Sequence, residues 1–372
     1  MSDHGAPLAT EGDEGRAHQG AVLSVDTGAI VANWRELARR HGAEAAGVVK
    51  ADAYGHGAVA IAPALARAGC RVFFTAHFAE ARALRAALHA SLPPPRIAVL
   101  NGLGPAEIAS CRAADLVPVL SSLAQIALWR GAGGGTAFLH ADTGMNRLGL
   151  SEADMAAIAA EPGLLAGIEV ALLMTHLAAS EEPANPANAA QRERFGQLAA
   201  RFPGWRTSLA NSSGIFLGPD FASDLARPGA ALYGINATPG HANPMQPAGR
   251  LTAPVLQLRD IRAGDSVGYN ATWRAARPSR IATVAVGYAD GWPRVLGNSG
   301  HALFDGHVLP LVGRVSMDLT TYDATGVPGL AEGSRVTLLG EGLAAETVAA
   351  WAGTNAYEVL TRLGPRVARC YR

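Results

Sequence analysis

Short apolar runs alternate with Ala-, Leu- and Arg-rich stretches from about residue 27 to residue 240. Near-continuous apolar strands that alternate with helices are typical of a parallel sheet covered on both faces. Eight runs have the length and residue types of such strands: GVVKA (47–51), VFFTA (72–76), RIAVL (96–100), LVPVL (116–120), TAFLHA (136–141), IEVALLMTH (168–176), TSLANS (207–212) and SDLARPG (223–229). Helical composition lies between them, as in Gly57–Ala68, Phe78–Ala90, Pro105–Ala113 and Gln191–Arg201. Eight units favour a closed (β/α)8 barrel of the TIM type, and a doubly wound open sheet is the alternative.

The pattern changes after residue 250. Short strands then follow one another across Gly, Asp and Pro turns, as in PVLQLRDI, RIATVAVGY, HVLPLVGRV and RVTLLG. This is typical of a second, mainly β domain, and a helical stretch from Glu346 to about Leu363 is expected to close it. The predicted organisation is a disordered leader (1–20), an α/β barrel (21–250) and a mainly β C-terminal domain (251–372), with residues 239–249 as the hinge.

Composition narrows the functional classes. Lys+Arg and Asp+Glu number 31 each, so net charge provides no general attraction to nucleic acid or anionic lipid. No apolar run reaches the length of a membrane span, and residues 1–20 lack the apolar core of a signal peptide. The three cysteines (Cys70, Cys111 and Cys370) show neither metal-ligand nor disulfide spacing, which fits a reducing compartment. We expect a cytoplasmic protein with a small-molecule substrate and no metal.

One lysine stands at the end of the first predicted strand, in VVKADAYGHG (48–57). Burial there would lower the pKa of Lys50 from roughly 10.4, so that the neutral amine becomes accessible. Such lysines form Schiff bases with carbonyl compounds, including pyridoxal phosphate (PLP). A lone strand-end lysine more commonly reaches back to water, so the surrounding motifs have to decide between the two interpretations.

Polar residues also end the last four predicted strands, and in a barrel these ends share one rim with Lys50. His140 ends the fifth strand, with Arg147 in the loop that follows, and His176 ends the sixth. Each residue alone is a weak signal, because buried histidines are usually structural. Together they predict an active site at this rim.

The last two strand ends predict a phosphate site. The Ser212 hydroxyl and the backbone N–H groups around Gly229 lie after strands seven and eight, the usual place for phosphate in a barrel, and Tyr54 could add a hydroxyl. Neither a Walker A motif nor a dinucleotide fingerprint occurs, which argues against a nucleotide. A phosphate site and a nucleophilic lysine on one rim indicate PLP as the cofactor.

In its motifs the chain resembles the alanine racemase family of PLP-dependent barrel enzymes (fold type III). VVKADAYGHG, DTGMNRLG, MTHLA, NSSG, RPGAALYG, GYNATW, VGYADGW and GRVSMDLTTYD follow in the family's order, over about residues 20–372. The resemblance implies a racemase that interconverts L- and D-alanine through a PLP external aldimine by a two-base mechanism, for peptidoglycan (D-alanine biosynthesis) or alanine catabolism. The alternatives are a PLP-dependent racemase of serine or of broader specificity, and a non-catalytic PLP-binding protein.

The resemblance also implies residue roles. Lys50 would carry PLP and act as one base, and Tyr269 would be the second base, contributed to the other subunit of a homodimer with shared active sites. Met317 would lie near the substrate, which Arg147 would also contact, and Arg227 would face the pyridine nitrogen. The first strand, about 21–26, would pack with the C-terminal domain. The implied cofactor-binding residues are Lys50, Tyr54, Arg147, His176, Ser212, Arg227, Gly229, Ala230 and Tyr357.

One position departs from the family's pattern. Many members have a carbamylated lysine where this chain has His140, and that lysine braces the arginine matching Arg147. A neutral imidazole could accept a hydrogen bond from Arg147, but it lacks the negative charge. His140 is equally compatible with a purely structural role.

Overall fold

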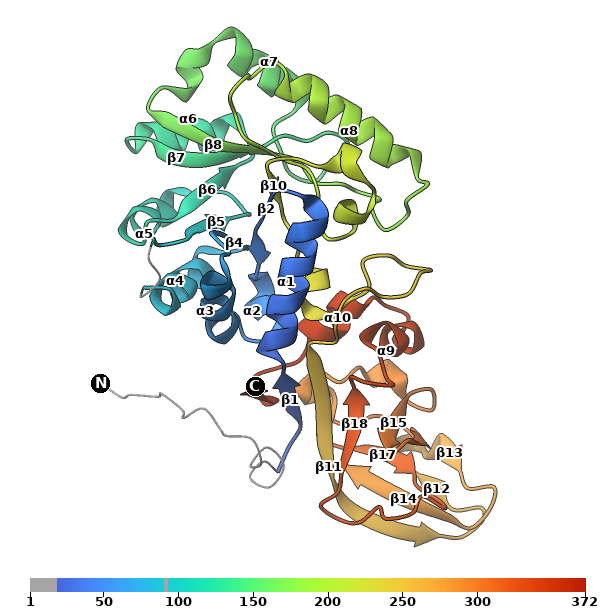
Figure 1. The fold of residues 1–372 in the computed structure, drawn as a ribbon. Helices are drawn as coiled ribbons and strands as arrows, with labels where there is room; N and C mark the ends of the chain where they lie inside the picture. Colours follow the sequence, from blue (N-terminus) through green and yellow to red (C-terminus); the bar gives the residue numbers. More distant parts are fainter. Residues whose placement is uncertain (1–18, 90–92) are drawn as a thin grey trace, which may run out of the picture.

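The computed structural model describes residues 19–89 and 93–372, so residues 1–18 of the predicted leader lie outside the described residues. Figure 1 shows a barrel of strands and helices above a mainly β region, with one long strand, β11 (Gly249–Ile261), leading from the junction into the lower part. No helix in the described part of the chain is long and apolar enough to span a membrane.

The barrel is built from a curled parallel sheet whose seven strands follow chain order. They are β3 (Gly47–Val48), β4 (Val72–Thr75), β5 (Arg96–Val99), β6 (Val117–Leu120), β7 (Gly135–His140), β8 (Ile168–Met174) and β9 (Thr207–Ser208). The eighth strand, β10 (Leu225–Ala226), pairs in parallel with β2 (Glu44–Ala45), which leads into β3. A bridge between Asn211 and Arg227 connects β9 to β10. The predicted (β/α)8-type barrel is therefore confirmed.

The central parts of the longer barrel strands are apolar because both of their faces are buried. Phe73 and Phe74 illustrate this, since Phe73 packs outward against the helices and Phe74 packs inside the barrel. In the same way, Leu139 packs outward against the helices and Phe138 packs inside the barrel. Successive side chains of a strand point to opposite faces, so a covered parallel sheet needs apolar residues at both.

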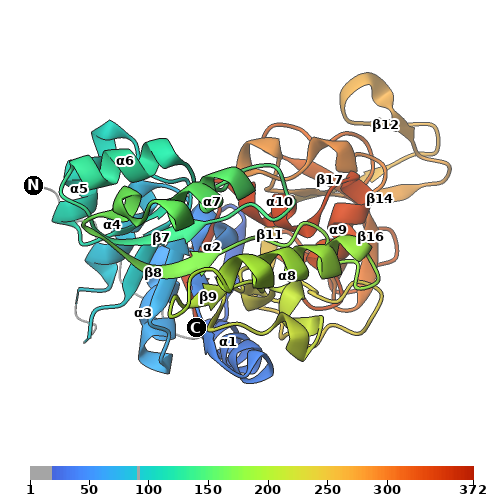
Figure 2. The same ribbon diagram turned by 90° about the horizontal axis from the view of Figure 1, so that it is seen from above.

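Helices surround this sheet (Figures 1 and 2). They are α1 (Thr27–His41), α3 (Ala58–Ala68), α4 (Phe78–Ala87), α5 (Ile108–Ala113), α6 (Leu123–Gly131), α7 (Glu152–Ala160) and α8 (Pro186–Ala199). Local sequence sets their ends: Asp26 caps α1 by accepting the N–H of Ala29, and Gly42 ends it in the left-handed conformation at φ 75°.

The C-terminal region forms a second sheet around β11, in the order β16-β15-β18-β11-β1-β19, while β14 pairs with the far part of β11 and β17 pairs with β14. Its strands are β1 (Val22–Val25), β14 (Ser279–Val284), β15 (His301–Phe304), β16 (His307–Pro310), β17 (Thr320–Asp323), β18 (Arg335–Leu339) and β19 (Ala368–Tyr371), while β12 (Ser266–Val267) and β13 (Trp273–Arg274) pair separately. The N-terminal strand β1 runs antiparallel to β11 and parallel to β19. The predicted domain boundaries stay a prediction.

The predicted closing helix takes a different form. Two helices, α9 (Ala345–Ala352) and α10 (Ala356–Thr361), occupy its place. Gly353 ends α9 at φ 63°, and the side chain of Asn355 caps α10 by accepting the N–H of Glu358. The predicted helical stretch is therefore confirmed as two helices with a break at Gly353, and strand β19 follows it.

Candidate active site

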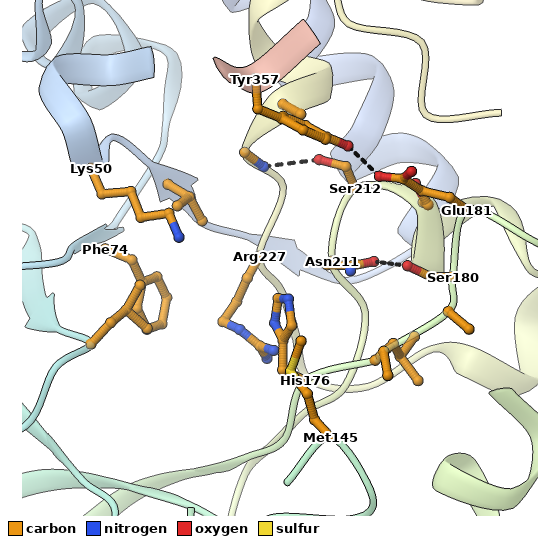
Figure 3. A pocket seen from close by; sticks show the side chains of 18 of the residues that line it. Lys50, Phe74, Met145, His176, Ser180, Glu181, Asn211, Ser212, Arg227 and Tyr357 are labelled. Atoms are coloured by element: carbon orange, nitrogen blue, oxygen red, sulfur yellow. Dashed lines mark hydrogen bonds between the residues drawn. The ribbon is translucent and has the colours of Figure 1, made fainter. Parts of the chain in front are cut away.

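A cavity of 770 Å³ lies at the carboxyl ends of the barrel strands (Figure 3). Its volume is typical of pockets that hold a cofactor and a small substrate. Phe74, Leu100 and Met145 contribute apolar wall. The lining includes all nine predicted cofactor-binding residues: Lys50, Tyr54, Arg147, His176, Ser212, Arg227, Gly229, Ala230 and Tyr357.

Lys50 is the first residue of a short turn that follows strand β3. In α2 (Lys50–Gly55), residues 51–54 have φ between 51° and 54°, which is a left-handed helical turn. Left-handed geometry costs roughly 1–2 kcal/mol per non-glycine residue, so neighbouring contacts have to offset it. Glu80 Oε1 accepts the Ala51 N–H at 2.7 Å, and Asp52 Oδ1 accepts the Ala58 N–H at 2.8 Å.

This turn leaves Lys50 half-buried, with its amine directed into the cavity (Figure 3). Burial lowers the pKa of Lys50, the positive charge of Arg147 lowers it further, and Glu80 opposes both effects. A larger fraction of the amine is therefore neutral near pH 7 than for a solvated lysine. A neutral amine is the form that attacks a carbonyl or accepts a proton.

Hydroxyl and amide groups converge on the opposite wall. Ser212 Oγ accepts the N–H groups of Gly229 at 3.0 Å and of Ala231 at 3.3 Å. A Cβ on Gly229 would lie only 2.5 Å from the hydroxyl oxygen of Tyr54, so glycine allows this tyrosine to approach the backbone. Burial raises the pKa of Tyr54 to about 12, which keeps its hydroxyl protonated and able to donate.

Arg227 and His176 lie side by side on the cavity floor (Figure 3). The Arg227 guanidinium is buried and donates to Ser208 Oγ and to the carbonyl oxygen of Thr175. Burial lowers the pKa of Arg227 to about 9, so the group stays charged at neutral pH. Burial first, and then Arg227, lower the pKa of His176 to about 3, so its imidazole is neutral.

Tyr357 reaches the cavity from α10 and donates a hydrogen bond to Glu181 Oε1 (Figure 3). Burial, followed by the hydrogen bond to this carboxylate, raises the pKa of Tyr357. Sequence analysis missed Glu181, which lies in the loop after β8. Its place after the sixth strand, on the rim that carries His176, was the available signal.

His140 does not line the cavity, although it ends β7. Its side chain is buried, and burial, followed by the charge of Arg227, lowers its pKa to about 4. Arg147 is exposed in the following loop, and among the described residues no hydrogen bond joins it to His140. The structure therefore favours the structural interpretation of His140 over the bracing one.

Comparison with known proteins identifies this constellation. The family model for the alanine racemase N-terminal domain matches residues 25–237, and the model for the alanine racemase C-terminal domain matches residues 248–371. An alanine racemase from Acidiphilium cryptum is 59% identical over 352 residues, which covers 94% of this chain and 98% of that protein. The chain belongs to the alanine racemase family.

Solved structures agree with this assignment. The alanine racemase from Bartonella henselae, described with covalently bound pyridoxal phosphate, has a TM-score of 0.89 at 40% identity and covers 95% of this chain and 99% of its own. A biosynthetic alanine racemase from Pseudomonas aeruginosa has a TM-score of 0.88 at 36% identity, covering 95% and 100%. A relative from Mesorhizobium japonicum, 46% identical over 95% of this chain and 94% of its own length, is named a catabolic alanine racemase.

The cavity fits the PLP of this racemase family on its own chemistry. Hydroxyl donors at Ser212 and Tyr54, the amides after Gly229, and the missing Cβ of that glycine form a cradle for a phosphate group. Lys50 opposite them supplies an amine for the aldehyde. Among the described residues, no group of three His, Cys, Asp or Glu side chains is arranged to hold a metal.

Two predicted residues are absent from this cavity. Tyr269 follows β12, with its side chain 68% exposed, and Met317 lies in the loop before β17, 54% exposed. Both belong to the C-terminal region, and neither lines the barrel cavity of its own chain. A role for either in catalysis therefore requires a second subunit.

Proposed function

We propose that this protein interconverts L- and D-alanine with PLP by a two-base mechanism, in a homodimer whose active sites are shared between subunits. The observation that carries the proposal is the single cavity in which Lys50, with its lowered pKa, faces a cradle of hydroxyl and amide donors. Bound PLP withdraws electrons from the Cα of an attached amino acid and so makes its proton removable.

Lys50 would hold the cofactor covalently and move the Cα proton on one face of the substrate. Its lowered pKa suits this task, because an amine that is partly neutral near pH 7 can accept a proton and return it. Racemisation requires a second group on the other face, since one base cannot reach both sides of a planar centre. The partner subunit's Tyr269 would supply it.

The other residues would hold and orient the cofactor. Ser212, Tyr54, Tyr357 and the amides of Gly229 and Ala230 would bind its phosphate, and Arg147 would contact the cofactor and the substrate carboxylate. Arg227 would face the ring nitrogen, supported by His176. A guanidinium has only donors, so it cannot accept a hydrogen bond from a protonated ring nitrogen as a carboxylate would, and the nitrogen would stay unprotonated. This limits electron withdrawal by the ring and disfavours side transamination.

Two further parts of the proposal concern context. Cys70 and Cys111 are buried and form no disulfide among the described residues, which supports a cytoplasmic location. Relatives named biosynthetic and catabolic alanine racemases are both similar to the chain, so D-alanine supply for peptidoglycan and alanine breakdown are both compatible with it.

The decisive experiment uses purified protein, PLP and L-alanine in deuterated water. The expected result is D-alanine with deuterium at Cα, together with PLP attached to Lys50 after borohydride reduction, as located by peptide mass spectrometry. The Lys50→Ala variant, treated identically, serves as the control and should show neither. Attachment of PLP without any exchange at Cα would indicate a PLP-binding protein and contradict the proposal. Faster racemisation of serine than of alanine would overturn the substrate assignment.

A further inference from the structure

His56 lies immediately beyond the lysine turn and is not among the residues that line the active-site cavity. Its side chain is 1% exposed. Sequence analysis gave it no role, and nothing in the proposed chemistry uses it. Its contacts nevertheless connect the turn that carries Lys50 to the phosphate cradle and to the junction with the C-terminal region.

The first contact fixes the tautomer of the imidazole. His56 Nδ1 lies 3.2 Å from the carbonyl oxygen of Ala53 and 3.0 Å from that of Tyr54. Carbonyl oxygens only accept, so Nδ1 carries the proton and donates to the turn. Nε2 is then the unprotonated nitrogen, and it is buried without a hydrogen-bond partner among the described residues. Protonating Nε2 would place a charge in this enclosed position, and burial accordingly lowers the pKa of His56 to about 4.

The carbonyls that His56 binds belong to the strained part of the turn. Ala53 and Tyr54 both have φ 54°, within the left-handed stretch that begins one residue after Lys50. A right-handed path would move these carbonyls away from the ring and would redirect the chain that follows Lys50. The His56 N–H therefore stabilises the local geometry that aims the lysine amine into the cavity.

The second contact is a stack of three rings. The His56 ring stacks on Tyr233 with centroids 5.0 Å apart, and Tyr233 stacks on Tyr54 at the same distance. The Tyr233 hydroxyl donates to the carbonyl oxygen of Val48 at 2.9 Å, two residues before Lys50. Tyr54, at the end of the stack, is the residue that approaches Gly229.

The third contact closes the other side of the ring. A Cβ on Gly249, the first residue of β11, would lie 2.9 Å from His56 Nε2. The imidazole is thus held between the start of the long strand and Tyr233.

We propose that His56 is a positioning residue for cofactor binding: its Nδ1–H holds the left-handed turn that presents Lys50, and its ring fixes Tyr54 at the phosphate cradle through Tyr233. The inference rests on the proposed function, since it takes Lys50 and Tyr54 as the PLP-binding groups.

Two variants separate the two contacts. His56→Phe keeps an aromatic ring and removes the donor, whereas His56→Asn keeps an N–H near the position of Nδ1 and removes the ring. The control is His41→Asn, because His41 is also buried and bonded to a carbonyl (Ser223, 2.8 Å) but lies at the end of α1, outside the cavity. For each protein we would measure PLP affinity by titrating cofactor-free enzyme, hydrogen exchange of the amides of residues 51–57, and melting temperature.

His56→Phe should weaken PLP binding about tenfold and accelerate amide exchange in the turn. Phenylalanine has no N–H, so the carbonyl oxygens of Ala53 and Tyr54 lose their buried hydrogen-bond donor. His56→Asn should restore slow exchange but only part of the affinity, because the ring that stacks on Tyr233 is missing. His41→Asn should lower the melting temperature alone. If both His56 variants bind PLP as tightly as the unmodified protein and only melt earlier, His56 is merely structural and the inference is overturned. If His56→Asn is as impaired as His56→Phe, the hydrogen-bond assignment is wrong.

The exchange measurement keeps this test independent of the chemistry. It is made on cofactor-free protein, so it reports on the turn even if PLP does not attach to Lys50. Failure of the unmodified protein to attach PLP would contradict the proposed function, while unchanged exchange in His56→Phe would contradict the role of His56.

Discussion

The side chains of the barrel cavity and the exposed Tyr269 of the C-terminal region differ in burial and in whether they have partners within the described part of the chain. In the barrel, Arg227 is 4% exposed and Ser212 7%, and each has its partners within the chain. Tyr269, by contrast, is 68% exposed. The C-terminal region also carries other large exposed apolar side chains: Tyr288 (41%), Val295 (62%), Met317 (54%) and Leu319 (37%).

Backbone contacts connect several of these exposed residues. The N–H of Tyr288 donates to Ser316, and that of Ala289 donates to Met317, both at 3.0 Å. Large apolar patches are uncommon on monomers and usually mark interfaces. One chain therefore encloses the cavity that fits the cofactor, whereas Tyr269, the proposed second base, lies outside this cavity on an exposed surface.

The largest effect is expected when the two halves are damaged in separate chains. Lys50→Ala and Tyr269→Phe should each lose racemase activity by a factor of about 10²–10⁴ or more, the usual contribution of a catalytic proton-transfer group. If the sites are shared, unfolding and refolding an equal mixture creates mixed dimers in which one site has both intact residues. With random pairing, about a quarter of the unmodified activity should return.

No return of activity in that mixture, although mixed dimers are detected by native mass spectrometry, would place both residues in one chain's site. The control is a mixture in which one protein carries both substitutions and the other is unmodified. If the sites are shared, both sites of each mixed dimer then lack one group, so only the unmodified dimers, about a quarter of the total, should be active; about half of the unmodified activity would instead place both residues in one chain's site.

A second, smaller effect should distinguish the two faces of the substrate. By the proposed roles, Tyr269→Phe removes the base that acts on L-alanine, while Lys50 still acts on D-alanine. Exchange of the Cα hydrogen with deuterated water should therefore fall at least about 10²-fold from L-alanine and persist from D-alanine. Mass spectrometry of the recovered amino acid measures both. Equal loss of exchange from the two enantiomers would contradict the role given to Tyr269.

Some parts of the fold and of the site could be predicted from the sequence, and others could not. The eight strand positions and the gathering of rim residues could be predicted, because apolar runs fix the strands and parallel strands place their carboxyl ends together. The left-handed turn after Lys50 could not, since Ala51 and Ala53 have no preference for that conformation and long-range contacts impose it. For Glu181 the only signal was its place after the sixth strand, which does not distinguish one exposed acidic residue from the others in loops.

A third effect concerns the cradle of the barrel. Ser212→Ala should weaken PLP binding about tenfold, because it removes a hydroxyl and leaves two buried N–H groups without their acceptor. The matched control is Ser299→Ala in the C-terminal region, where the hydroxyl donates to the carbonyl oxygen of Leu296 at 3.2 Å. That change should affect melting temperature but not PLP affinity. Equal PLP affinity in Ser212→Ala and the unmodified protein would remove this serine from the phosphate site.

The smallest effect should appear in the pH dependence of stability, and it belongs to the barrel. Burial lowers the pKa of His140 to about 4 and that of His176 to about 3, from 6.5 in the unfolded chain. Between each folded-state pKa and 6.5, the unfolded chain binds more protons than the folded protein. The contribution of each neutral histidine to the free energy of unfolding is therefore complete above pH 6.5, and it is lost as the pH falls toward 4 for His140 and toward 3 for His176. His140→Gln removes one such group, and its melting temperature should therefore fall less steeply than that of the unmodified protein between pH 6.5 and 4. Adding His176→Gln should flatten the curve further and extend the difference toward pH 3.

Carboxylates titrate in all three proteins alike, so the differences between the curves isolate the histidines. Parallel curves would mean that these imidazoles are as well solvated in the folded barrel as in the unfolded chain. The barrel site would then not be enclosed, and the contrast with the exposed C-terminal region would be contradicted.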